Sequence, residues 1–307
     1  MNRIAPICFL LCLLSLPALA QTPITGPTIF YKYGSPGAPA SADVAGCGTS
    51  NTNACETFNF LYAQLVSNYV LKPGGAILIQ ISGNVHNDTF ACQGRMPGQT
   101  NPRQIEVVGS MSSPTSFLVS PSSGDAFSAA FDCEYSIGGL MAQNNSGGQG
   151  VFTVGQGGRI DLLGQIYSKG APGQPTIGND LTAALFGIIE LQTPGGPDAL
   201  GITVTGNYWF QGPGQCAFDA GDQGEIIADG NGQPNIFTFS WNGQTYSAGT
   251  GCANNHGVIQ LENITHKGSV SGREYDIITG GTIDAATTGL PHSLPGVFTP
   301  DPGFTGP

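Results

Sequence analysis

The sequence predicts an all-β protein, a parallel β-solenoid of about eight coils with a helix at its N-terminal end. Two observations support this prediction: a composition with 9% charged residues beside 47 glycines and 22 prolines, and a short strand motif that recurs along the chain. Coiled coils and long helical bundles contain far more charged and helix-forming residues. The hydrophobic content of 40% is nevertheless enough to form a packed core.

The recurring motif is Gly-x-Ile-x-Leu/Ala, in which alternate residues of a short strand face the same side. Its clear copies are Gly158–Leu162, Gly187–Leu191, Gly224–Ala228, Gly257–Leu261 and Gly281–Ala285, with an early copy at Gly75–Ile79 and weaker ones centred on Ile105 and Tyr135. The centres lie 24–37 residues apart, a spacing typical of solenoids in which each strand pairs with its copy one turn below. The glycine lets the chain turn a corner where a side chain would obstruct stacking. A β-sandwich also contains short strands and glycine turns, but it does not explain the return of one motif.

One segment has helical rather than strand periodicity. Residues 57–70 place apolar side chains at helical spacing, with Thr57 as a candidate N-cap and Pro73 and the following glycines as a stop. We expect this helix to cover the open first coil, because an uncovered solenoid end invites edge-to-edge association.

The order of the motifs resembles that of bacterial and prophage right-handed parallel β-helix proteins, including phage-tail-like members. The resemblance rests on Cys47–Ser50, Glu56–Phe58, the helix and Gly74–Ile81 at one end, and on Gly272–Ile277, Gly281–Asp284 and Pro295–Gly296 at the other. It implies a right-handed parallel β-helix but no single activity, because this fold hosts lyases, hydrolases, adhesins and structural coils. We expect a signal peptide at 1–20, an N-terminal extension with a Cys-containing entry loop at 21–56, the β-helix at 57–285 and a Pro/Gly-rich tail at 286–307.

The N-terminus is typical of an export signal. Arg3 precedes an apolar run from Ile7 to Leu16, and Ala18-Leu19-Ala20 forms a small-x-small cleavage pattern, so we predict a secreted or periplasmic protein that starts at Gln21. A lipid anchor on Cys12 is the alternative. No other stretch approaches the 18 apolar residues of a membrane span. With nine Lys and Arg against 20 Asp and Glu, the chain does not suit nucleic acid.

Cysteine usage agrees with export. Six cysteines follow the predicted signal, namely Cys47, Cys55, Cys92, Cys133, Cys216 and Cys252. An even number in an exported chain predicts up to three disulfides, and spacing favours the pairs Cys47–Cys55 and Cys216–Cys252. Zinc is the competing interpretation, but no CxxC motif occurs and no histidine adjoins a cysteine. We therefore expect no metal and no cofactor.

Two groups of residues are candidates for a site. The first is aromatic: Tyr208, Trp209, Phe237, Phe239, Trp241 and Tyr246. Phe237, Phe239 and Trp241 alternate, so they share one face, which is either an outward platform for sugar rings or part of the interior. The second is the pair Asp161 and Glu190, which stacks on neighbouring coils and provides weak catalytic candidates, since glycosidases use paired carboxylates. A solvated acidic face explains the same pair.

These features favour a non-catalytic secreted β-helix protein, adhesin-like or tail-spike-like, that binds a polysaccharide or a cell-surface glycan. A glycan-cleaving enzyme and a purely structural prophage-derived coil are the alternatives, and a homotrimer is an open assembly state. A polysaccharide lyase of this fold requires calcium-binding or basic groups that the sequence does not offer. No Ser/His/Asp motif is present.

Overall fold

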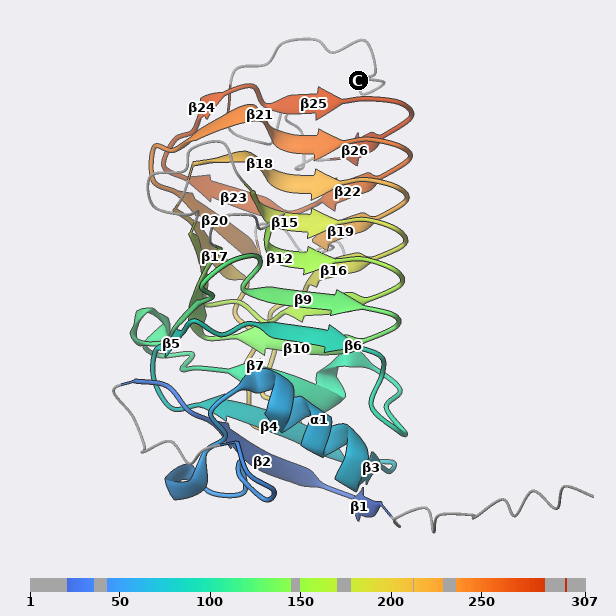
Figure 1. Cartoon of the computed structure of the whole chain (residues 1–307). Helices are drawn as coiled ribbons and strands as arrows, with labels where there is room; N and C mark the ends of the chain where they lie inside the picture. The colour runs from blue at the N-terminus through green and yellow to red at the C-terminus, as the bar shows by residue number, and fades with distance from the viewer. Residues whose placement is uncertain are drawn as a thin grey trace, which may run out of the picture.

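The chain forms a parallel β-helix whose coils pass through three long sheets (Figure 1). The computed structural model describes residues 21–35, 43–144, 150–169, 178–211, 213–228 and 236–284 together with Gly296. Neighbouring strands within each sheet run parallel, as in β13 and β16 or β14 and β17. The predicted all-β parallel solenoid is confirmed. The predicted signal peptide, and the predicted tail apart from Gly296, lie outside the described residues.

The nine-stranded sheet contains the predicted copies of the motif, apart from Ala285 of the last copy, which lies outside the described residues. Its strands in order are β2 (Pro27–Lys32), β4 (Ala76–Ile81), β7 (Ile105–Val108), β10 (Glu134–Gly138), β13 (Arg159–Leu162), β16 (Ile188–Leu191), β19 (Glu225–Ala228), β22 (Val258–Leu261) and β26 (Thr282–Asp284). The motif centres pair in register, for example Ile160 with Ile189 and Ile226 with Ile259, and these four side chains are fully buried. They form the inward column that the sequence predicts.

Two further sheets complete the coils. The seven-stranded sheet contains β5 (Val85–His86), β8 (Leu118–Ser120), β11 (Leu140–Gln143), β14 (Ile166–Lys169), β17 (Asn207–Phe210), β20 (Phe237–Trp241) and β23 (Ile264–Lys267). The third sheet contains β6 (Phe90–Gln93), β9 (Phe127–Ala130), β12 (Gly150–Val154), β15 (Asn179–Ala183), β18 (Gly214–Ala220), β21 (Thr245–Ala253) and β24 (Ser271–Gly272), and β25 (Tyr275–Ile277) also pairs with β21. Strands β1 (Thr22–Ile24) and β3 (Tyr69–Leu71) form a small separate sheet, and the short 3-10 helices are η1 (Asn51–Asn53), η2 (Pro102–Gln104) and η3 (Pro114–Ser116).

The sheet begins earlier than the sequence indicates. Strand β2 lies in the segment predicted as an N-terminal extension, yet it pairs along its whole length with β4. The entry loop covers part of its other edge, because the Tyr31 amide donates to the Gly48 carbonyl and the Cys55 amide donates to the Tyr31 carbonyl. The first strand of the solenoid is therefore shielded by its own chain, as open strand edges usually are.

Helix α1 (Phe58–Asn68) closes the interior beside β2, as predicted for the cap helix. The Thr57 side chain accepts a hydrogen bond from the Phe60 amide, which is the expected N-cap. The buried face of the helix packs on β6, where the Phe58 and Phe90 ring centroids lie 5.3 Å apart. An ion pair fixes the same end: the ammonium of buried Lys32 lies 3.1 Å from the Asp88 carboxylate and 4.9 Å from the centre of the Phe58 ring.

The glycine of the motif is required by the backbone of the coil below. A Cβ atom added to Gly257 would lie 2.1 Å from the Ala220 carbonyl oxygen, and one added to Gly224 would lie 2.3 Å from the Ala183 oxygen. Neither gap can accommodate a methyl group. The corner before β10 has Cys133 in place of glycine, and its sulfur is bonded to Cys92 on β6.

Three disulfides join the six cysteines. The favoured pairs Cys47–Cys55 and Cys216–Cys252 are present, and the third links Cys92 to Cys133. The pair Cys216–Cys252 joins neighbouring strands of the third sheet, so it ties two coils together. The disulfides indicate an oxidising compartment.

Replacing Gly257 with alanine tests the backbone constraint. We expect the free energy of unfolding to fall by about 3 kcal/mol, because the added methyl group meets the Ala220 carbonyl, which accepts a hydrogen bond from the Asn254 amide. Gly195→Ala is the matched control, since nothing lies within 4 Å of its added Cβ. Chemical denaturation of both variants measures the difference, and equal losses would contradict this explanation of the motif.

Peptide mapping of the unreduced protein tests the disulfides. Proteolysis followed by mass spectrometry should recover the three linked pairs. Each native disulfide contributes about 2–5 kcal/mol in small exported domains, so reduction should also lower the melting temperature. Recovery of Cys92 and Cys133 as free thiols would contradict the link between β6 and the corner before β10.

Candidate functional site

The strongest candidate site is the outer surface of the seven-stranded sheet, which lies to the left in Figure 1. We call this surface the aromatic face. Its central row, read along the solenoid axis, is Leu118, Met141, Tyr167, Trp209, Ser240 and Lys267. These side chains point outward because their strand neighbours point inward: Ile166 and Tyr208, for example, are only 2% and 1% exposed.

The centre of the row is a stacked pair of aromatic rings. The ring centroids of Tyr167 and Trp209 lie 4.2 Å apart and the ring planes differ by 2°. Because the rings are face to face and their strands are neighbours in the sheet, the ring normals point along the solenoid axis. One face of Trp209 is therefore covered by Tyr167, and the other is directed toward β20, where its register partner is the small residue Ser240.

The strands that surround this pair carry polar side chains and no acids. None of the seven strands of the sheet contains Asp or Glu, although the chain has 20 such residues. The rows beside the aromatic pair offer amides, hydroxyls and a lysine: Gln143 pairs with Lys169 on one side, and Asn207, Thr238 and Thr265 follow one another on the other. Aromatic rings flanked by amides and hydroxyls can stack on a sugar ring and hydrogen-bond to its hydroxyl groups.

Five of the six predicted ligand-binding aromatic residues are interior, which corrects the hypothesis of an outward platform. The exposed fraction is 6% or less for each of Tyr208, Phe237, Phe239, Trp241 and Tyr246. Phe237, Phe239 and Trp241 do share one face, as their alternation predicts, but that face lines the core. Trp209 alone among the six points outward, and its partner Tyr167 was not among the predicted residues.

The carboxylates of Asp161 and Glu190 are held in a network of ion pairs and hydrogen bonds with Arg159 and Gln192. The two residues are register partners on β13 and β16, as expected. Arg159 donates to both carboxylates, at 2.7 Å to Asp161, and the Gln192 amide donates to Asp161 at 2.8 Å and to Glu190 at 3.0 Å. Asp161 is 1% exposed, and burial raises its pKa to about 7 although Arg159 opposes the shift. Both carboxylates are therefore engaged by Arg159 and Gln192.

A second acidic cluster on the same sheet fastens a loop. Arg103 donates to Asp198 at 2.7 Å and to Glu106 at 3.3 Å, and Asp198 also accepts hydrogen bonds from the amides of Leu200 and Ile202. Glu106 is fully buried, and this burial raises its pKa to about 9, with Asp198 adding to the shift. The cluster therefore attaches the loop between β16 and β17 to the corner before β7.

A third buried carboxylate, Asp180, lies where the seven-stranded sheet meets the third sheet. It is 3% exposed and accepts hydrogen bonds from the hydroxyls of Ser168 and Tyr246, both of which are also buried. Burial raises its pKa to about 7, and the two hydroxyls oppose the shift. Sequence reasoning did not find this residue, because the partners of Asp180 lie on other strands.

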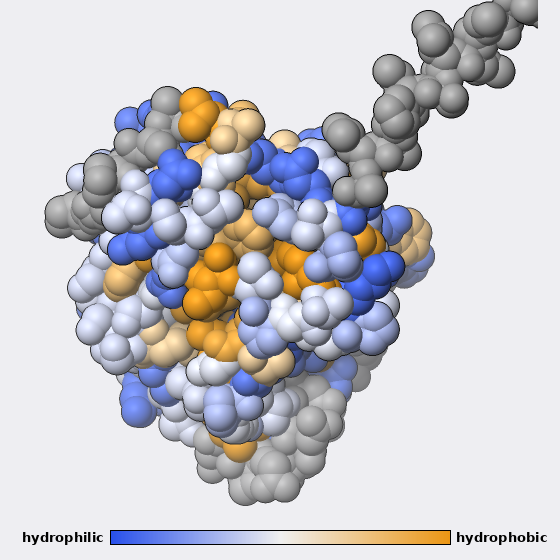
Figure 2. All heavy atoms as spheres, turned by 90° about the horizontal axis from the view of Figure 1, so that it is seen from below, coloured by the Kyte–Doolittle hydropathy of each residue, from blue (hydrophilic) through white to orange (hydrophobic). Residues whose placement is uncertain are grey.

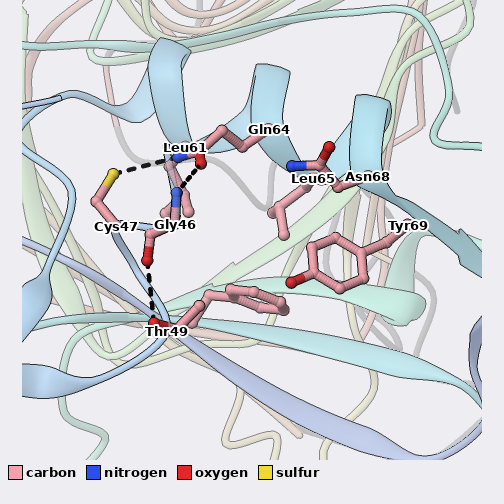
Figure 3. Close-up of a pocket in the computed structure, with 9 residues that line it drawn as sticks. Gly46, Cys47, Thr49, Leu61, Gln64, Leu65, Asn68 and Tyr69 are labelled. Carbon is pink, nitrogen blue, oxygen red and sulfur yellow. Dashed lines mark hydrogen bonds between the residues drawn. The ribbon is translucent and has the colours of Figure 1, made fainter. Parts of the chain in front are cut away.

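The N-terminal end of the solenoid contains a small hollow. Apolar residues gather near the centre of this end, and hydrophilic ones surround them (Figure 2). Between α1 and β2, Phe30, Leu61 and Leu65 form the apolar part of the hollow. The side-chain oxygen of Gln64 accepts a hydrogen bond from the Gly46 amide, and its side-chain nitrogen donates to the Cys47 sulfur (Figure 3). The hollow holds about 30 Å³, room for about two water molecules, and is too small for a sugar.

Other site types find little support in the described residues. The single group there with metal-ligand chemistry is Asp43 with Cys47 and Cys55, whose sulfurs are joined in a disulfide. The Asp43 carboxylate accepts hydrogen bonds from the Glu56 amide and from the amide and hydroxyl of Thr57. Over the same residues, no helix combines the length and apolar character needed to cross a membrane.

Because buried carboxyl groups have raised pKa values, we expect the free energy of unfolding to increase as the pH falls from about 7 to about 4. The pKa of Asp180 is about 7 in the folded state and about 3.9 when unfolded, so the folded state binds the proton more tightly. The carboxylate therefore destabilises the fold progressively as the pH rises from about 4 to 7, by an amount on the order of 4 kcal/mol. In Asp180→Asn, denaturation measured from pH 4 to 8 should show a weaker loss of stability with rising pH. Asp222→Asn at an exposed turn is the control, and an unchanged pH dependence in Asp180→Asn would contradict the prediction.

The comparisons with known proteins add no relative to these observations. No family model, no curated protein and no solved structure matches the chain. The resemblance to phage-tail-like β-helix proteins therefore stays a prediction, and the chemistry of the site rests on its own residues.

Proposed function

We propose that this protein is a secreted, non-catalytic glycan-binding protein, adhesin-like or tail-spike-like, whose contact surface is the aromatic face. The observation that supports this most directly is the Tyr167–Trp209 stack, which presents aromatic surface on the outside of a rigid sheet. Exposed aromatic residues held in a fixed orientation contribute contact area at low entropic cost. The disulfides are in keeping with a role outside the cytoplasm.

The enzyme alternative has weaker support because its candidate carboxylates are engaged. A glycosidase needs one carboxyl group on each side of the scissile bond, about 5–10 Å apart in a space that admits the substrate. Asp161 and Glu190 are instead bridged by Arg159 and Gln192. The purely structural alternative explains the stack as a cross-strand aromatic pair that stabilises the sheet, and a binding measurement separates the two roles.

Tryptophan fluorescence provides a direct test, because the chain has two tryptophans and Trp241 is buried. In Trp241→Phe, glycans added from a polysaccharide panel should change the emission of Trp209. Trp209→Ala should weaken binding in affinity electrophoresis by about tenfold, which corresponds to the loss of about 1.4 kcal/mol of contact energy. Phe186→Ala removes an aromatic side chain that is 65% exposed on a distant turn, and it should bind as the unmodified protein does. Unchanged affinity in Trp209→Ala would refute this binding surface.

A further inference from the structure

The free face of Trp209 borders a notch along the central row of the aromatic face. The next residue of the row beyond Trp209 is Ser240, and the one after it is Lys267. Neighbouring strands of a sheet lie about 4.8 Å apart, so the backbones that carry Trp209 and Lys267 are about 9.6 Å apart. Ser240 between them has a short, half-buried side chain, so within the described strands this row has little side-chain bulk between Trp209 and Lys267.

The dimensions of the notch suit one sugar ring. A ring stacked on Trp209 requires a van der Waals separation of about 3.5–4.0 Å from the indole, and about 6 Å then remains to the strand that carries Lys267, room for an anionic substituent of the ring. The indole is held in place by its stack on Tyr167, so the surface is ordered before the ligand arrives. The hydroxyl of Ser240 lies at the back of the notch, where it can donate to a ring substituent.

The positive charge of Lys267 at the notch favours anionic sugars over neutral ones. Lys267 is exposed, and the structure shows no ion pair between it and any described carboxylate. The strands around it contain no Asp or Glu, in a chain whose net charge is −11. An ammonium group with no acidic neighbour on its sheet is free to pair with an anion from the ligand. Nucleic acid is disfavoured, because proteins that bind single strands follow the backbone with a basic groove, whereas the seven strands of this sheet carry only two lysines, Lys169 and Lys267.

We infer that the notch formed by Trp209, Ser240 and Lys267 binds an anionic sugar residue of the glycan, with the ring on Trp209 and a carboxylate or sulfate at Lys267. This inference rests on the proposed function and specifies the ligand class of the same surface. Both anions are acceptors for an ammonium group, so the two sources share one chemistry.

The test compares charged and neutral forms of one polymer. The probes are alginate, which contains uronate groups, carboxyl-reduced alginate, which is its neutral form, and heparin, which is sulfated. Binding is followed by Trp209 emission in Trp241→Phe and by affinity electrophoresis. We expect binding to alginate, to heparin or to both, at least tenfold weaker binding to the neutral polymer, and a loss of affinity as salt rises.

Three substitutions locate the anion contact. Lys267→Gln should reduce affinity for the charged polymer about tenfold and leave the weak binding of the neutral polymer unchanged. Lys72→Gln is the control at an exposed lysine on another part of the solenoid. Ser240→Phe fills the notch and should abolish binding of every probe, while its unfolding transition shows that the fold is intact.

The possible failures are distinguishable. Equal binding of charged and neutral polymers that depends on Trp209 but not on Lys267 would overturn the anionic inference and leave glycan binding in place. Absence of any Trp209-dependent binding would overturn both proposals. Tighter binding of a single-stranded oligonucleotide than of any glycan would also refute the inference, because the same notch would then serve a nucleotide.

Discussion

The close contact between each coil and the backbone of the coil below is the constraint on which this fold depends. Where the chain enters the nine-stranded sheet, a Cβ at Gly75, Gly224 or Gly257 would lie 2.1–2.3 Å from a carbonyl oxygen of the preceding coil. At these three corners only a residue without a side chain permits that approach, so the coils can stack with their strands in register, whereas the corner before β10 has Cys133 instead. The inward column of isoleucines then follows, because strand alternation fixes which residues face the core once the corner is set.

Because the strands are in register, equivalent residues of successive coils align in rows along the solenoid axis. The side chains of a row determine whether it forms internal contacts or can bind a ligand. On the nine-stranded sheet, Asp161 and Glu190 lie one above the other beside Arg159, so opposite charges neutralise one another and the row becomes part of the framework. On the seven-stranded sheet, Tyr167 and Trp209 occupy the equivalent arrangement without any acid or base between them. The row that contains Tyr167 and Trp209 is therefore available to contact a ligand from solution.

The sequence predicts those features that depend on local spacing. The motif positions, the cap helix and the disulfide Cys47–Cys55 follow from alternation, helical periodicity and proximity in the chain. The disulfide Cys216–Cys252 follows from a spacing of about one coil. Which face of residues 237–241 is inward does not follow, because residues 229–236 separate β20 from the motif in β19 and the alternation cannot be counted across them. The sequence does not show that Tyr167 and Trp209 are neighbours for a related reason. Trp209 lies 42 residues after Tyr167, in a coil lengthened by the loop that contains Asp198. Strand β2 lacks the glycine motif, and only its pairing with β4 identifies it.

The distribution of charge completes the argument for a binding surface. Glu106, Asp161 and Asp180 are buried, and their raised pKa values show that burial disfavours the charged forms. Some of the carboxyl groups of this protein are thus buried, and the strands of the seven-stranded sheet carry none. An anion that approaches the outer surface of this sheet therefore meets little local repulsion. The backbone of that surface is fixed by parallel pairing on both sides, so a ligand loses its own freedom on binding but the protein loses little. A few contacts along one row are then sufficient to hold a glycan, which is why the stack of Tyr167 on Trp209 matters more than the number of aromatic residues in the chain.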